Sequence, residues 1–228
     1  MSDPILVVAA HPDDEVLGCG ATAARLASEG REVHIAILGE GITSRYDQRG
    51  EADLSLIAAL KARSQRAADR VGARQLQMFD FPDNRFDSVP LLDIVKVVEK
   101  LVSTIRPSTI YTHSGGDLNI DHVVLHRAVL TATRPLQGTP VREIYAFEIP
   151  SSSDWTFGQF APTFRPNVFV DVEQTLEAKV EAMEVYDSER RAFPHPRSPE
   201  ALRATARRWG SVVGAAAAEA FELIRAIR

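Results

Sequence analysis

The segment 10–15, with the sequence AHPDDE, places one imidazole and three carboxyl groups in a single turn. Like charges this close together disfavour ionisation unless a cation or hydrogen bonds compensate for them. A divalent metal would compensate, and a histidine nitrogen together with an aspartate oxygen suits zinc. The alternative is that one aspartate caps the helix that follows while His11 is an ordinary loop residue. The segment alone leaves both interpretations open.

A second polar cluster could complete a metal site. It comprises His113, Asp117, Asn119, Asp121, His122 and His126. A catalytic zinc site needs a third protein ligand and an open position for water. A helix is expected to begin near Asp121, which puts His122 in its first turn and His126 one turn further from the site. We therefore expect His122 to be a ligand and His126 to be structural.

Apolar runs and periodic segments predict the elements that position these groups. The run 5–10 predicts a buried strand, 15–27 predicts a helix, and 33–38 predicts a second strand. This βαβ order indicates parallel strands covered by helices. Further strands are expected at 76–79, 109–112, 143–148 and 167–170, and further helices at 52–71, 91–105, 121–133, 172–186, 199–209 and 215–227. The fold class is α/β, and both polar clusters follow strands, where ligands bind in such sheets.

Composition narrows the remaining possibilities. A length of 228 residues with 45% hydrophobic content indicates a single domain spanning 1–228. The 26 basic and 31 acidic residues give a net charge of −5 without any basic block, so a nucleic-acid partner is not expected. The lone cysteine, Cys19, is typical of a reducing compartment, and no apolar run is long enough for a signal peptide or a membrane span. We expect a cytoplasmic protein.

Four segments carry a family resemblance. They are AHPDDE at 10–15 with VLGCG at 16–20, FPDNRFD at 81–87, DLNIDH at 117–122, and the closing stretch from 179 to 221. With these segments the chain resembles the LmbE or PIG-L family of zinc-dependent N-deacetylases. The resemblance implies a Rossmann-like α/β fold with helices on both faces of a mainly parallel sheet. It also implies removal of an acetyl group from an amino sugar such as an N-acetylglucosamine conjugate, and it makes a homo-oligomer plausible.

Site residues follow from the same resemblance. It implies one zinc ion per chain, bound by His11, Asp14 and His122, with other divalent transition metals as possible substitutes, and it makes Asp13 the general base. Asp121 is retained as a further catalytic residue. Many family members have a histidine three residues before the last ligand, and this chain has Asn119 there.

Other side chains are candidates for the roles that this difference leaves open. His113 or His195 could stabilise the oxyanion in place of the missing histidine, as could the amide of Asn119. Sugar hydroxyls need directional hydrogen bonds, for which the candidates on loops are Arg45, Asn84, Arg85 and Asn119.

Two other function classes fit parts of the pattern. One is a carbohydrate-binding protein of the same fold that has lost its activity, because Asn119 replaces the usual histidine. The other is a magnesium-dependent phosphoryl-accepting domain, since an acidic pair after the first strand also suits magnesium. The histidines argue against the latter because magnesium prefers oxygen ligands.

Overall fold

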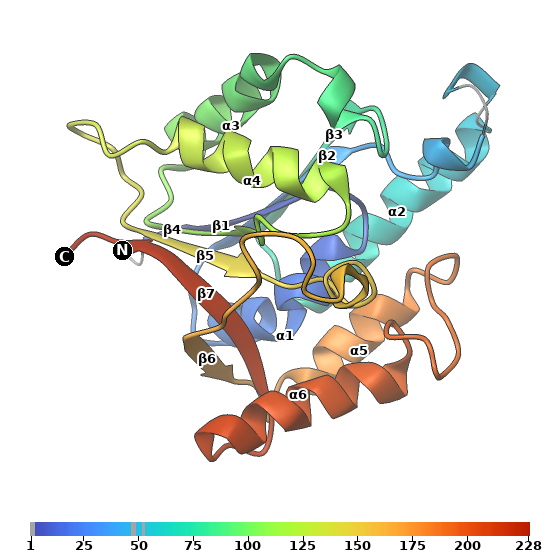
Figure 1. The fold of residues 1–228 in the computed structure, drawn as a ribbon, viewed down its shortest axis with the longest axis vertical. Helices are drawn as coiled ribbons and strands as arrows, with labels where there is room; N and C mark the ends of the chain where they lie inside the picture. The colour runs from blue at the N-terminus through green and yellow to red at the C-terminus, as the bar shows by residue number, and fades with distance from the viewer. Residues whose placement is uncertain (1–2, 47–48, 52) are drawn as a thin grey trace.

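Strands and helices alternate along the chain in the computed structural model, which describes residues 3–46, 49–51 and 53–228 (Figure 1). The strands are β1 (Ile5–Ala9), β2 (Val33–Gly39), β3 (Gln75–Phe81), β4 (Thr109–His113), β5 (Glu143–Phe147), β6 (Val168–Asp171) and β7 (Ala218–Ala226). The α-helices are α1 (Asp14–Ser28), α2 (Leu54–Arg70), α3 (Leu91–Ile105), α4 (Ile120–Ala132), α5 (Leu176–Glu184) and α6 (Pro199–Val213). Short 3₁₀ helices lie at η1 (Thr43–Arg45), η2 (Arg49–Glu51), η3 (Phe86–Ser88) and η4 (Asp154–Thr156).

All seven strands form one sheet in the order β3-β2-β1-β4-β5-β7-β6. The central strand β1 pairs in parallel with both β2 and β4, whereas β7 runs antiparallel to its neighbours β5 and β6. The strand order reverses between β1 and β4, and ligands bind at this kind of switch point in open α/β sheets. The structure thus confirms the predicted α/β class with a mainly parallel sheet.

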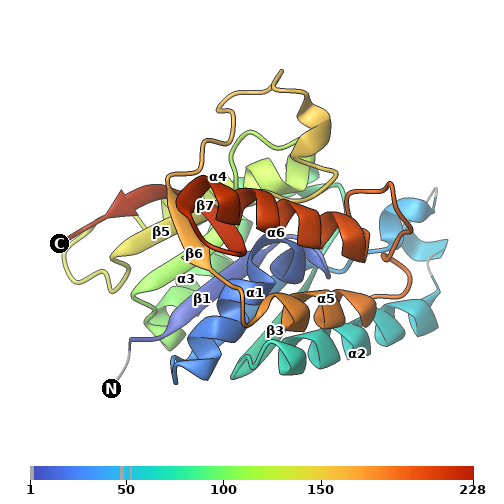
Figure 2. The same ribbon diagram turned by 90° about the horizontal axis from the view of Figure 1, so that it is seen from below.

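Helices cover both faces of the sheet, as the alternation of side chains along β1 requires. Ile5, Val7 and Ala9 belong to the apolar core shared with α1, α2 and α5, while Leu6 and Val8 belong to the core shared with α3 and α4. Figures 1 and 2 show α3 and α4 on one side of the sheet and α1, α5 and α6 on the other. Because each face is buried, β1 is apolar throughout and its polar residues come only after it ends.

The C-terminal segment differs from the prediction. The sequence predicts a helix at 215–227, but the structure has the strand β7 there. Alanine, glutamate and leucine give this segment a high helix propensity. Propensity is a weak preference, however, and two long-range partners outweigh it here. Gly214, at a φ of 76°, ends α6, and the chain then turns back to pair with both β5 and β6.

Other predicted boundaries differ by less. The helix predicted at 172–186 is α5, which begins only at Leu176, and the helix predicted at 199–209 continues to Val213. The helix predicted at 52–71 is α2, and its first predicted residue, Ala52, lies outside the described residues. Among the described residues, none of the helices is long and apolar enough to cross a membrane.

Gly18 gives a test of the packing between α1 and β5. A Cβ atom at this position would lie 2.3 Å from Cδ2 of Phe147, whose side chain is 0% exposed and has no room to move away. Overpacking of this kind costs about 1–3 kcal/mol, so we expect Gly18→Ala to lower the free energy of unfolding by that amount in urea denaturation. The matched control is Gly50→Ala, because a Cβ atom there meets nothing within 4 Å. Equal stability of the two variants would contradict this account of the α1–β5 contact.

Candidate active site

The turn between β1 and α1 has a strained backbone. Asp13 adopts a φ of 105°, a conformation that residues other than glycine rarely adopt, and its side chain makes no capping hydrogen bond to α1. Instead, Oδ2 of Asp14 accepts the backbone N–H of His11 at 2.8 Å. The helix-capping interpretation of the acidic pair therefore does not apply to Asp13, and strain of this kind is often found at functional sites.

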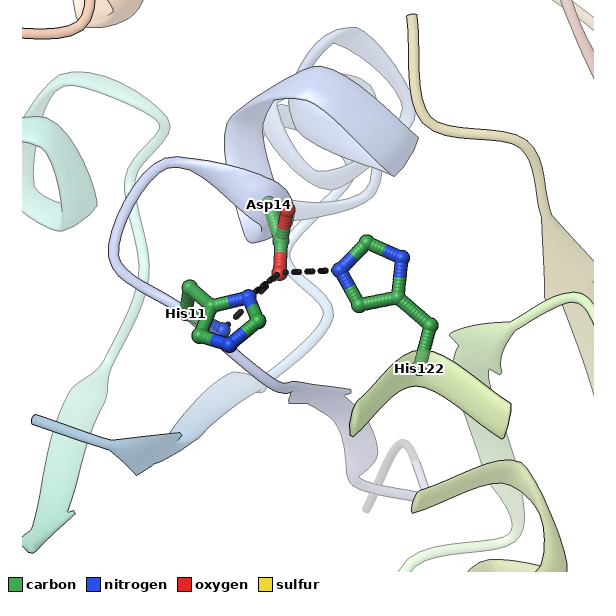
Figure 3. Close-up of side chains that lie close together, drawn as sticks. All are labelled: His11, Asp14 and His122. Atoms are coloured by element: carbon green, nitrogen blue, oxygen red, sulfur yellow. Dashed lines mark hydrogen bonds and ion pairs between the residues drawn. The ribbon is translucent and has the colours of Figure 1, made fainter. Parts of the chain in front are cut away.

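His11, Asp14 and His122 come together at the switch point of the sheet (Figure 3). Oδ2 of Asp14 lies 3.2 Å from Nδ1 of His11 and 3.2 Å from Nε2 of His122. His11 comes from the turn after β1, Asp14 is the first residue of α1, and His122 comes from the first turn of α4. Asp14 and His122 are both buried, whereas the side chain of His11 is 12% exposed and borders a pocket.

This arrangement fits a tetrahedral metal ion. Zinc bonds to nitrogen and oxygen at about 2.0–2.2 Å, so two ligand atoms in tetrahedral geometry are about 3.3 Å apart. The two distances of 3.2 Å agree with that spacing. In addition, Nε2 of His122 is buried, and its 3.2 Å contact with Oδ2 of Asp14 does not have hydrogen-bond geometry. A metal ion between the two atoms would use the lone pair of this nitrogen, and buried polar atoms without such a partner are costly.

A second group of possible ligands shares His11 and adds Asp83 and Asp121. Nε2 of His11 lies 2.9 Å from Oδ2 of Asp121 and 3.4 Å from Oδ1 of Asp83. A neutral imidazole has one N–H group and one free lone pair. If Nε2 donates its proton to Asp121, then Nδ1 keeps the lone pair that faces Asp14, and this favours the first group as the metal site.

Carboxylates orient both imidazole rings by contacting the ring nitrogen that faces away from Asp14. Asp121 accepts from His11 and also accepts the backbone N–H of Phe86 at 2.8 Å, which holds its carboxylate in place. Oδ1 of Asp117 lies 3.0 Å from Nδ1 of His122, and Asp117 in turn accepts the hydroxyl groups of Ser152 and Ser153. Carboxylate–histidine pairs of this type fix the ring orientation and increase the basicity of a metal ligand.

The electrostatics of the site favour a bound cation. Burial alone would lower the pKa of His122, but the carboxylates of Asp14 and Asp117 raise this pKa to about 9. Conversely, burial opposes ionisation of Asp117, yet the contact with His122 lowers the pKa of Asp117 to about 2. The carboxylates therefore attract a positive charge into the site, and a divalent metal can replace the proton on the imidazole.

Asp13 lies beside this group and has a different partner. Its Oδ2 accepts from Nη1 of Arg197 at 2.8 Å, and the backbone N–H of Asp13 donates to Glu15 at 3.0 Å. Burial raises the pKa of Asp13 well above its usual value, the guanidinium group of Arg197 opposes this shift, and nearby carboxylates reinforce it. A carboxylate with a raised pKa that is not a ligand suits a general base.

A polar pocket with a volume of about 150 Å³ opens over these residues. Its lining residues are His11, Pro12, Asp13, Asp14, Gly41, Ile42, Ser44, Arg45, Leu60, Asp83, Asn84, Asn119, His122, Ser152, Glu189 and Arg197. Asn84 and Asn119 are joined by a hydrogen bond of 2.8 Å, and Arg45 pairs with Glu189. Three of the four residues predicted to contact substrate therefore lie in this wall.

Three other predicted residues lie elsewhere. Arg85 is exposed and does not line the pocket. His113 is fully buried behind His122, with its ring stacked at 3.9 Å and its Nε2 accepting the backbone N–H of Ala10. His195 packs its ring against Trp155, with ring centroids 5.5 Å apart, and is likewise outside the pocket lining.

Arg197 is a site residue that the sequence analysis does not identify. It brings the guanidinium group to Asp13, and its Nε also donates to Ser151 at 3.1 Å. Arg197 is separated from Asp13 by most of the chain, in a proline-rich loop before α6, so no local spacing relates the two. The only local signal is an arginine between prolines, which is also typical of an ordinary surface loop.

Comparison with known proteins relates the chain to one family of enzymes. Residues 6–133 match the PIG-L family model, described as GlcNAc-PI de-N-acetylase. The uncharacterized deacetylase YaiS of Escherichia coli K12 is 28% identical over 81% of this chain and 90% of its own length. A probable N-acetyl-alpha-D-glucosaminyl L-malate deacetylase 2 of Bacillus cereus is 25% identical over 85% of this chain and 86% of its own length.

Solved structures with this fold include an enzyme that performs other chemistry. The 4-carboxy-2-hydroxymuconate hydratase GalB of Pseudomonas putida KT2440 superposes with a TM-score of 0.77. It is 21% identical, and the match covers 100% of this chain and 98% of that one. Similarity at this level shows the shared fold alone, so the activity has to be argued from the site itself.

Asp117 gives a test of the carboxylates behind the histidines. Asp117→Asn removes the charge that faces Nδ1 of His122, and losing such a partner typically weakens metal binding 10–100-fold. We expect this loss of zinc affinity in a competition titration with a chromogenic chelator. The control is Asp69→Asn on the exposed side of α2, which should bind zinc like the parent protein. Unchanged affinity in Asp117→Asn would show that Asp117 does not support the metal ligand.

Proposed function

Because the chain belongs to the PIG-L family, we propose that it is a metal-dependent hydrolase that removes an N-acetyl group from an amino-sugar conjugate. The observation that carries the proposal is the convergence of His11, Asp14 and His122 at the base of a polar pocket. Zinc is the metal that this donor set suits best. N-Acetylglucosamine conjugates are favoured as substrates by the names of the family and of the Bacillus cereus relative.

Bound zinc would polarise the acetyl carbonyl and lower the pKa of its water from near 16 to about 7. Asp13 would take the proton of the attacking water and later pass it to the departing amine. It is suited to both steps because burial raises its pKa. Asp121 would act through His11 as a positioning residue, since its carboxylate contacts the imidazole at 2.9 Å and does not line the pocket.

The developing negative charge on the acetyl oxygen needs a donor in addition to the metal. Arg197 lines the pocket and lies beside Asp13, whereas His113 and His195 do not line it. We therefore favour Arg197 for this role, in addition to keeping Asp13 in place. Asn119 is a weaker candidate because its Oδ1 caps α4 through the N–H of Asp121 and its Nδ2 donates to Asn84.

The sugar would bind against the walls of the pocket. Arg45, Asn84 and Asn119 provide donors and acceptors for hydroxyl groups, and Ser44 and Ser152 add hydroxyl groups of their own. Asp83 organises this wall, because it accepts both the N–H and the hydroxyl of Ser44, at 3.1 and 2.7 Å. The wall is thus held in position before a substrate arrives.

Amine release tests the proposed activity directly. The zinc-loaded protein, incubated with a panel of N-acetylglucosamine glycosides, should generate primary amines detectable with fluorescamine. Treatment with a chelator should abolish this release, and added zinc should restore it, because the water is activated only by the metal. If the glycosides bind but none releases an amine, the protein is a carbohydrate-binding protein. If metal analysis of the purified protein finds magnesium and no zinc, a phosphoryl-accepting domain is favoured.

Substitutions can distinguish the proposed role of Asp13 as general base from that of His122 as metal ligand. Asp13→Asn removes the base without removing a ligand, so kcat should fall by about 10²–10⁴-fold while the zinc content remains near one per chain. His122→Ala should lose the zinc itself, as measured by metal analysis after dialysis. Loss of metal from Asp13→Asn would contradict the proposed division of roles between Asp13 and the ligand Asp14.

A further inference from the structure

Helix α1 is interrupted in its second turn. Cys19 has φ −149° and ψ 24°, which is not a helical conformation. In an unbroken helix, the N–H groups of Ala21 and Thr22 would donate to the carbonyls four residues earlier, those of Leu17 and Gly18. A break inside a buried helix leaves such groups in need of other partners.

A buried ion pair provides those partners. Oε2 of Glu219 accepts the N–H of Thr22 at 2.7 Å, and Oε1 of Glu219 accepts the N–H of Ala21 at 3.3 Å. Nζ of Lys179 donates to the carbonyl of Leu17 at 2.8 Å and to Oε1 of Glu219 at 2.6 Å. Lys179 is 7% exposed and Glu219 is 5% exposed. The two charges therefore neutralise each other while each also binds one side of the helix break.

Both charged residues come from elements late in the chain. Lys179 lies on α5, and Glu219 lies on β7, where the sequence analysis predicts a helix. Thr175, just before α5, also contacts the break by donating its hydroxyl to the carbonyl of Ala21 at 2.9 Å. Tertiary contacts to the backbone on both sides therefore stabilise the break, which does not depend on the local sequence of α1 alone.

We propose that Lys179 and Glu219 are positioning residues for the metal centre, acting through the break in α1. The turn before the break begins with Asp14, whose Oδ2 must lie 3.2 Å from Nε2 of His122 to share a metal with it. If α1 closed into a continuous helix, this first turn would tilt relative to the rest of α1. Metal–ligand distances in a well-formed site lie within about 0.2 Å of their usual values, so a tilt that moves Asp14 further than this would weaken binding.

This inference rests on the proposed metal site but not on the deacetylase activity. Cobalt(II) is a suitable probe, because its visible absorption reports binding to His and Asp ligands without any substrate. We would titrate Co²⁺ into the parent protein, Lys179→Met, Glu219→Gln and the double variant, at temperatures where circular dichroism shows each to be folded. We expect the Kd for Co²⁺ to rise about tenfold or more in all three variants, as when an outer-shell partner is lost.

Two features separate positioning from a general loss of stability. The double variant leaves no unpaired charge in the core, so it should stay folded even if Lys179→Met does not. The control Ile94→Ala creates a cavity at a fully buried position of α3 on the other face of the sheet, and it should lose stability while keeping the parent Kd.

Values of Kd within twofold of the parent in the folded double variant would overturn the role of Lys179 and Glu219 while leaving the proposed hydrolase intact. A parent protein that binds no Co²⁺ would overturn the metal centre and this inference together. A protein that binds Co²⁺ with the expected differences but releases no amine from acetylated sugars would contradict only the proposed activity.

Discussion

One carboxylate oxygen, Oδ2 of Asp14, joins the parts of the site. It accepts the backbone N–H of His11, lies 3.2 Å from the imidazoles of both His11 and His122, and lies 3.5 Å from Nε2 of His113. These contacts bring the turn after β1, the end of β4 and the start of α4 to a single point. So many buried polar groups at one point are stable only if the charge of the carboxylates is compensated. A divalent cation compensates this charge most completely.

Support for this turn comes mainly from the last third of the chain. Lys179 and Glu219 bind the break in α1, and Arg197 pairs with Asp13. Tyr186 donates its hydroxyl to Glu15 at 2.6 Å, and the pKa of this carboxyl group is raised to about 7 chiefly by burial. All of these supporting residues lie beyond the matched family segment 6–133. The turn between β1 and α1 is therefore supported largely from outside the matched segment, whereas Asp117 and Asp121, which orient the histidines, lie within it.

The fold by itself does not determine the reaction, since a hydratase shares it with a TM-score of 0.77. Function depends on the side chains at the switch point of the sheet. In this chain those side chains combine a possible metal-binding group, a separate carboxylate with a raised pKa, and a guanidinium group beside it. Amide hydrolysis needs these three capabilities together: an activated water, a proton acceptor and a donor for the oxyanion.

The sequence alone determined the features that depend on local order. Apolar runs and their spacing predicted the α/β class. They also predicted that the AHPDDE segment and the downstream cluster would lie together, because strand ends in a parallel sheet meet at one edge. The family resemblance then implied His11, Asp14 and His122 as ligands. Tertiary structure decided the rest. Helix propensity gave a wrong prediction for β7, because this segment forms backbone hydrogen bonds with two strands that are distant in the sequence, β5 and β6. Arg197 reaches Asp13 through a loop whose path no local sequence pattern specifies. Pairwise contacts across long sequence separations depend on how all layers pack, and therefore only the folded chain defines them.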